Sequence, residues 1–163
     1  MKQALGVSIR QKSDGTATYT CKWKEGTEER RCKSVEFPRP ELESALDSLG
    51  TYIPLICMIP AENIRRTYTA GATFEYTKAG ITLLTLGVQL ELTNGASFEF
   101  TSPVVSVDLE HADPIAAQTP AEKISALAKE LHDEIIMYAE GKRAQQSLDL
   151  EQETEPDEEG GEN

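Results

Sequence analysis

The chain has 163 residues and a formal net charge of −12, and 39 % of its residues are hydrophobic. This length suits one domain built around a single buried core. No stretch is apolar for the roughly 18 residues that a membrane span needs, and the N-terminus lacks the pattern of a secretory signal, so we expect a soluble, cytoplasmic protein. Its three cysteines lack CxxC spacing and predict reduced thiols.

Most of the negative charge lies at the C-terminal end of the chain. Residues 151–163 hold seven acids and no lysine or arginine, and removing these acids from the formal −12 leaves −5 for residues 1–150. The acidic end has the composition of a disordered, solubilising tail. The charge of the remaining chain argues against a protein that coats duplex DNA, although a local basic groove is compatible with it.

Alternating apolar residues predict a β-hairpin at the start of the chain. Residues 5–9 and 17–23 each place apolar side chains on one face, and Asp14-Gly15 supplies the turn between them. Residues 30–37 predict a third strand, which Pro38 ends.

A helix is expected after the third strand, because Pro40 suits a first helical position and apolar residues then recur at helical spacing to Ile56. Gly50 and Pro54 interrupt this pattern. We expect a kinked helix that ends near Met58.

The second half of the chain again begins with strands. Residues 72–76 and 84–92 alternate, Asn94-Gly95 is the strongest signal for a tight hairpin turn, and residues 96–100 continue the apolar face on the return strand. Residues 103–118 resemble the remnant of a strand followed by a loop.

The last element is predicted to be a helix that starts at Thr119 and stops at Gly141. Thr119-Pro120-Ala121-Glu122 is a capping box with proline at the first helical position. One apolar stripe and one polar face follow. The polar face should expose Lys123, Lys129, Glu130, His132 and Asp133 to solvent.

The element order β-β-β-α-β-β-β-α predicts an α+β fold in which an antiparallel sheet has its helices packed on one face. We expect one domain over residues 1–141, followed by a flexible docking peptide and acidic tail over residues 142–163. The order also allows an internal duplication, although the sequence similarity of the two halves is too weak to establish one.

The segment after the last helix resembles a docking peptide. Gln145, Leu148 and Leu150 form the pattern Q-x-x-L-x-L, which is similar to the short peptides that bind bacterial sliding clamps. In those peptides the glutamine bonds at the rim of a pocket and the leucines fill an apolar cleft. A partner such as the host sliding clamp is therefore expected; the alternative is that both leucines fold back onto the body.

Basic residues gather in the second and third predicted strands, beside Tyr19 and Trp23. Cations that follow phosphates, together with rings that stack on bases, are typical of single-stranded nucleic-acid binding. The alternative is that the rings belong to the core and the cations are ordinary solvated strand residues. The candidate nucleic-acid contacts are Lys22, Lys24, Arg30, Arg31 and Lys33.

No pattern for catalysis is present in the sequence. Only His111, with Asp108, Glu110 and Asp113 nearby, has the character of a metal site, and its spacing fits no established site. A solvated acidic loop is the simpler interpretation. His132 does not complete a Ser-His-Asp or Cys-His catalytic set, and no glycine-rich phosphate loop is present in the sequence. We therefore predict a non-enzymatic protein without cofactor or metal.

Several segments together resemble small uncharacterised proteins of bacteriophages and prophages. The similarity covers roughly residues 40–150, and its most specific part is Tyr138-x-x-Gly141-Lys142-Arg143-Ala144-Gln145-x-Ser147-Leu148. Such proteins commonly end in a Lys-Arg-Ala-Gln-x-Ser-Leu signature. Many relatives then close with Leu-Phe, whereas this chain continues with Asp149-Leu150 and the acidic tail.

The resemblance implies an accessory role in phage DNA replication or recombination and imports no enzymatic activity. The expected mechanism is a tether that docks on the clamp through its C-terminal peptide while its sheet contacts single-stranded DNA. The alternative is an antagonist of a bacterial defence system, acting as an acidic decoy or by sequestering a nucleotide signal. The edge strands of a small sheet also permit a dimer.

Overall fold

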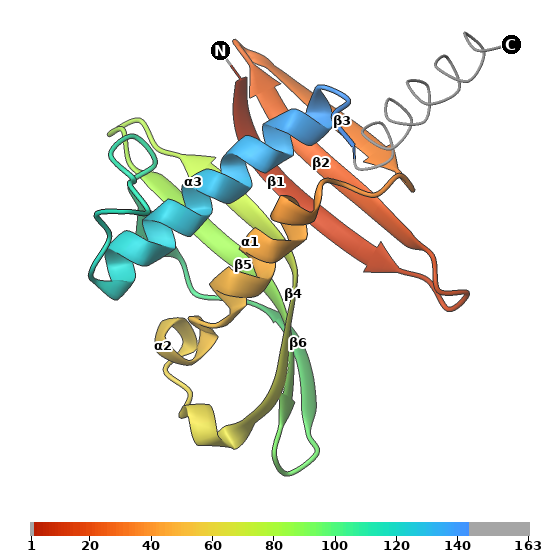
Figure 1. Cartoon of the computed structure of the whole chain (residues 1–163), viewed down its shortest axis with the longest axis vertical. Coiled ribbons are helices and arrows are strands. Elements are labelled where there is room, and N and C mark those ends of the chain that lie inside the picture. The colour runs from red at the N-terminus through yellow and green to blue at the C-terminus, as the bar shows by residue number, and fades with distance from the viewer. Residues whose placement is uncertain (1, 144–163) are drawn as a thin grey trace, which may run out of the picture.

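The computed structural model describes residues 2–143, which form one antiparallel sheet with helices across one of its faces (Figure 1). This is the α+β architecture expected from the order of the elements. The sheet has seven strands; six follow the order β3-β2-β1-β4-β5-β6, and β7 pairs with β5. The strands are β1 (Lys2–Gln11), β2 (Ala17–Glu25), β3 (Glu28–Ser34), β4 (Ile64–Tyr76), β5 (Thr82–Leu92), β6 (Ser97–Thr101) and β7 (Val105–Val107).

The first three strands form the predicted hairpin and its neighbour. Val7 pairs with Cys21, and Cys21 pairs with Cys32 on β3. Strand β3 ends at Ser34, earlier than the predicted Phe37. The physical reason is a local turn, because the Ser34 hydroxyl accepts a hydrogen bond from the Glu36 N–H at 3.0 Å and draws the backbone away from β2.

The predicted kinked helix is instead two separate helices, α1 (Pro40–Gly50) and α2 (Ile53–Cys57). The N–H and the hydroxyl of Thr51 both donate to the Ser48 carbonyl, which closes the last turn of α1. Pro54 has no N–H to donate to the carbonyl four residues earlier, so the helix cannot continue through it. A 3₁₀ turn, η1 (Ala61–Asn63), then leads into β4.

The two halves of the sheet have similar strand pairing on either side of the β1–β4 junction. Strands β1 and β4 meet at the centre, where Val7 pairs with Ala72. Val7 pairs with Cys21 in one hairpin and Ala72 with Leu86 in the other, so the same spacing separates the partners in both. The strand order is correspondingly symmetric about this junction. The two halves of the sheet therefore share one pattern of strand pairing.

The junction between the halves is narrow and depends on two glycines. Only three residue pairs join β1 to β4, and the hairpins diverge beyond them (Figure 1). A Cβ on Gly6 would lie 2.8 Å from the Ala72 carbonyl oxygen, and one on Gly71 would lie 2.6 Å from that of Val7. Both positions therefore require glycine, because the two backbones approach too closely for a side chain.

The core lies between the sheet and the two long helices, α1 and α3 (Pro120–Ala139). Helix α1, which follows the first three strands, contacts β4 of the second half. Helix α3, which follows the last strands, contacts β1 and β2 of the first half and also its neighbour in sequence, β7. The side chains with less than 2 % exposure include Leu42, Leu46, Leu49, Ile53, Leu84, Leu86, Leu131, Ile135 and Tyr138.

Helix α3 begins as its capping box predicts. The Thr119 hydroxyl accepts a hydrogen bond from the Glu122 N–H, and the Glu122 carboxylate accepts one from the Thr119 N–H. The helix ends before Gly141, whose φ of 89° is in the left-handed region. Over residues 2–143, no helix is long and apolar enough to cross a membrane.

One residue of the predicted polar face of α3, His132, is largely buried. The side chain of His132 is only 14 % exposed, and its ring lies edge-on to Phe74 with the ring centres 6.0 Å apart. Glu134 of the same helix is also buried, beside Arg39, and burial raises the pKa of its carboxyl. The predicted solvent exposure of His132 is wrong because α3 packs against both α1 and the sheet.

Candidate nucleic-acid interface

Strand alternation brings four of the five predicted basic residues onto one face of the sheet. Cys21 and Trp23 of β2 are buried, so Lys22 and Lys24, which alternate with them, project from the opposite, open face. Lys22 pairs with Arg31 of β3 in the ladder, and Thr20 pairs with Lys33. The open face of the first half therefore carries two rows of cations.

Arg30 does not join this group. It pairs with Trp23 in the ladder, on the side toward the helices, and forms an ion pair of 3.2 Å with Glu28. Alternation along β3 therefore separates Arg30 from Arg31 and Lys33, with which it was predicted as a nucleic-acid contact.

Arg10 is the cation that the sequence analysis missed. It lies on β1 opposite Thr18 and is exposed, between the buried Ile9 and the end of the strand. The alternation of residues 5–9 was the signal that would have found it, since it assigns Arg10 to the polar face. We use the term basic face for Arg10, Lys22, Lys24, Arg31 and Lys33.

The charge of the basic face is not neutralised within the described chain. Between residues 2 and 143, none of its five members forms an ion pair, whereas Lys2, Arg39, Arg65 and Lys129 each do. Lys22 and Arg31 lie directly opposite each other, and like charges in such a pair destabilise a sheet by roughly 0.2–1 kcal/mol. Glu29, opposite Lys24, is the acid that shares this face. A surface that keeps like charges together is suited to binding an anion.

Small and hydroxyl-bearing residues occupy the centre of the open face. In the ladder, Gly6 pairs with both Lys22 and Thr73, and Ser8 pairs with both Thr20 and Gly71. The two glycines are buried, whereas Ser8 and Thr73 are exposed. No large side chain therefore stands between the cations of the first half and the second half at this point.

The two aromatic residues of the first hairpin do not contribute to this surface. Tyr19 and Trp23 are 2 % and 8 % exposed and point toward the helices. Burial raises the pKa of Tyr19 to about 12, so its hydroxyl stays protonated. The alternative that these rings belong to the core is therefore confirmed, and they are not available to stack on bases.

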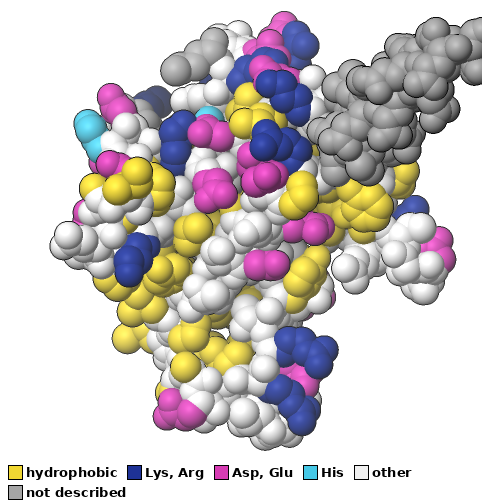
Figure 2. Space-filling view, in the orientation of Figure 1, with side chains coloured by type: hydrophobic (Ala, Val, Ile, Leu, Met, Phe, Trp, Pro, Cys, Tyr) yellow, Lys and Arg dark blue, Asp and Glu magenta, His cyan; other side chains and the backbone are white. Residues whose placement is uncertain are grey.

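On the opposite side of the molecule, helix α1 carries three acids and no lysine or arginine. Figure 2 shows the helical face, where acidic side chains are spread over α1 and α3. Those on α1 include Glu43 and Asp47, both exposed, and α3 adds Glu130. Positive charge on the open face and negative charge on the helical face give the protein an electrostatic polarity.

The described chain ends beside β3, where Arg143 is only 8 % exposed. Its guanidinium lies 3.5 Å from the centre of the Tyr138 ring, its Nε lies 3.1 Å from the Glu36 carboxylate, and its Nη2 lies 3.4 Å from Cys32 Sγ. A further hydrogen bond joins it to the Tyr138 carbonyl. Packing of the body thus continues two residues beyond the predicted boundary at residue 141. The predicted docking residues Gln145, Leu148 and Leu150 lie outside the described residues.

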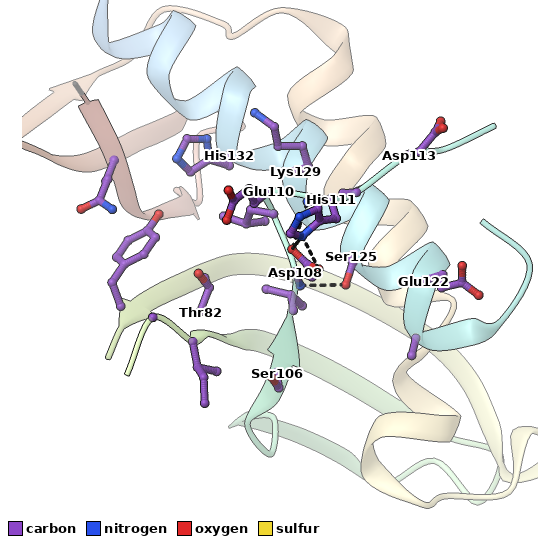
Figure 3. Close-up of a pocket in the computed structure, with 18 of the residues that line it drawn as sticks. Thr82, Ser106, Asp108, Glu110, His111, Asp113, Glu122, Ser125, Lys129 and His132 are labelled. Atoms are coloured by element: carbon purple, nitrogen blue, oxygen red, sulfur yellow. Dashed lines mark hydrogen bonds and ion pairs between the residues drawn. The ribbon is translucent and has the colours of Figure 1, made fainter. Parts of the chain in front are cut away.

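A cleft of about 1150 Å³ lies between α3, β7 and the loop after β7 (Figure 3). It contains the proposed acidic loop. The Asp108 carboxylate accepts a hydrogen bond from the His111 N–H at 3.0 Å, which lowers the pKa of Asp108, and the Ser125 hydroxyl accepts one from the Asp108 N–H. Asp113 points away from this pair (Figure 3).

The polar groups of this loop therefore fix its own conformation. Among residues 2–143, no group of three or more histidine, cysteine or carboxylate side chains is placed to hold a metal ion.

The cysteines are free thiols. Cys21 and Cys32 lie opposite each other in the ladder without a disulfide. Burial raises the pKa of Cys21 to about 12, so its thiol stays protonated and unreactive at neutral pH.

Comparisons with protein families, curated proteins and solved structures found no match. The function is therefore inferred from the chemistry of the surface itself.

Proposed function

We propose that this protein binds single-stranded DNA on its basic face, as a non-enzymatic accessory protein of phage DNA replication or recombination. One observation carries the proposal: five cations share the open sheet face and form no ion pair within residues 2–143, and two of them are directly opposed. Phosphates would relieve this repulsion on binding. A nucleic-acid backbone supplies them at a regular spacing.

A single strand suits this surface better than a duplex. Acidic side chains are spread over the helical side, and Glu75 and Glu99 lie exposed on the open face of the second half. A flexible strand can follow the cations of β1 to β3 and avoid these acids, whereas a rigid duplex cannot. Because Tyr19 and Trp23 are buried, binding depends on phosphate contacts and should have little sequence preference.

The test is fluorescence anisotropy with a labelled oligothymidylate of about 20 nucleotides. With four phosphate contacts, the logarithm of the affinity should fall by about three for each tenfold rise in salt. The double variant Lys22→Glu with Arg31→Glu should weaken binding at least about tenfold at low salt.

A matched control makes the same change of charge elsewhere, at Lys78 and Lys123, which are exposed and form no ion pair within residues 2–143. The control pair should bind DNA like the wild type. Equal losses in both double variants would show that only net charge matters, and no binding by the wild type would refute the proposal.

We further propose that Gln145, Leu148 and Leu150 dock on the sliding clamp or a similar replisome component. The support is the spacing of these residues and the anchor at Arg143, from which the peptide departs beside β3. A docked peptide would hold the basic face close to the DNA that the replisome exposes.

The acidic helical face favours a second candidate, an antagonist of a bacterial defence system. Such a decoy would use Glu43, Asp47 and their neighbours to occupy a basic surface of a host protein. It would bind that protein in a salt-sensitive manner and ignore free DNA, so the anisotropy experiment separates the two candidates.

A further inference from the structure

We propose that the acidic C-terminal segment, residues 151–162, binds the basic face of its own chain and competes there with nucleic acid. The competition rests on the proposed function, whereas the contact itself does not. The cations of that face form no ion pair within residues 2–143.

The anchor at Arg143 places the end of the described chain at the β3 edge of the sheet. Arg143 contacts Cys32, and Cys32 lies between Arg31 and Lys33, the two cations that β3 contributes to the basic face. Strand β3 is an edge strand, so no further strand separates the anchor from the open face. The segment needs only to pass around this edge.

The length of the chain is sufficient for that path. Seven residues lie between Arg143 and Glu151, and extended they span roughly 25 Å. Neighbouring strands are about 4.8 Å apart, so Arg31 on β3 and Lys22 on β2 are both within reach. A tether of this length gives a local concentration on the order of millimolar.

The charges are complementary. Residues 144–163 carry eight acids and no lysine or arginine, and the basic face carries five cations without an ion pair in the described chain. The acids of α1 would repel the segment, as would Glu75 and Glu99 on the open face of the second half. Each contact between exposed charges is weak, so the bound state should be an ensemble of contacts that salt abolishes.

The direct test is zero-length carbodiimide cross-linking of the full chain at low salt and high dilution, with mass-spectrometric mapping. Lys22, Lys24 and Lys33 should be joined to carboxylates of residues 151–162, and the cross-links should disappear in about 0.5 M salt. Lys78 and Lys123 serve as internal controls and should remain unlinked to the segment.

Two cross-linking results would overturn the proposal. Links distributed evenly over all exposed lysines would show no preferred surface. Links whose yield rises with protein concentration would assign the segment to a second copy of the chain.

The functional consequence is tested on a full-length variant in which the seven acids of residues 151–162 become the corresponding amides. This variant keeps the length of the chain and retains Leu148 and Leu150. It should bind oligothymidylate severalfold more tightly than the wild type at low salt, and the difference should vanish at high salt. Equal affinities of the two proteins would refute the competition.

The two proposals fail in different ways. If neither protein binds DNA, the proposed function is wrong, and the cross-linking pattern still decides the contact. If both bind DNA equally and the cross-links are unspecific, the contact is wrong and the proposed function survives.

Discussion

At the scale of single residues, the most informative feature is the opposition of Lys22 and Arg31 across the β2–β3 ladder. Two cations in directly opposed positions cost stability, and nothing else in the described chain compensates them with an ion pair. Residues that reduce stability are often those that serve binding. This reasoning separates the basic face from an ordinary solvated strand surface.

Arg31→Glu should therefore raise stability and weaken DNA binding at the same time. The new glutamate faces Lys22, so the free energy of unfolding at low salt should rise by about 0.5 kcal/mol. Urea denaturation measures the first effect and oligonucleotide anisotropy the second.

The matched control is Lys33→Glu, which changes the charge equally but faces Thr20. It should weaken DNA binding without the gain in stability. A loss of stability in Arg31→Glu would show that the arginine makes a contact that the structure does not contain.

At the scale of elements, the junction of β1 with β4 holds the two halves together through only three residue pairs. A Cβ on Gly71 of β4 would meet the backbone of β1, and Gly87 is the neighbour of Gly71 on β5. The two glycines lie side by side, yet their surroundings differ. Alanine substitutions at these two glycines therefore test whether the junction is as close as the structure shows.

Gly71→Ala should destabilise the protein by several kcal/mol, because its Cβ would lie 2.6 Å from the Val7 carbonyl oxygen and the strands would have to separate. Gly87→Ala should be neutral or slightly stabilising, since its Cβ would meet the nearest atom at 3.7 Å. Thermal unfolding monitored by circular dichroism compares the two. Similar melting temperatures for both variants would argue against the close junction.

The elements show how much of the fold the sequence determines locally. Helix α3 was predictable because its caps are local signals, and the β5–β6 hairpin because Asn94-Gly95 fixes its turn. Strand β4 starts at Ile64, whereas the predicted strand started at Ala72. The first part of the strand was missed because irregularities between Ile64 and Arg66 and between Thr69 and Gly71 break the alternation of apolar residues. The pairing of β1 with β4 joins residues that are far apart in sequence, so no local pattern reveals it.

The candidate site was predictable to a similar degree. Alternation alone assigns Lys22, Lys24, Arg31 and Lys33 to one face once the strands are known, and it also excludes Arg30. Their lack of ion-pair partners is a property of the tertiary structure. The contribution of Arg10 from β1 likewise depends on which strands are neighbours.

At the scale of the whole molecule, two regions of opposite charge lie on opposite sides of the described chain. The basic face looks away from the acidic helices, and the chain leaves the body at Arg143, beside the edge strand that carries Arg31 and Lys33. A partner bound to residues 145–150 would therefore lie next to the basic face. Docking and DNA binding would then reinforce each other, because the second contact becomes intramolecular.

The docking peptide is tested by Leu148→Ala with Leu150→Ala in the full chain. This double variant should lose the sliding clamp in a pull-down from host lysate while its thermal unfolding midpoint stays at the wild-type value, because the leucines enter the partner's cleft and not the core. Gln146→Ala with Ser147→Ala, in the same segment, is the matched control and should retain the partner.

A marked fall in the unfolding midpoint of the leucine variant would instead place both side chains against the body, since burying a leucine contributes roughly 2–3 kcal/mol and its loss would be visible in thermal unfolding. Retention of the clamp by both variants would exclude the peptide as its docking site. The basic face should still bind oligonucleotide in either variant, because neither leucine belongs to it, so clamp docking and DNA binding can be scored separately in the same preparations.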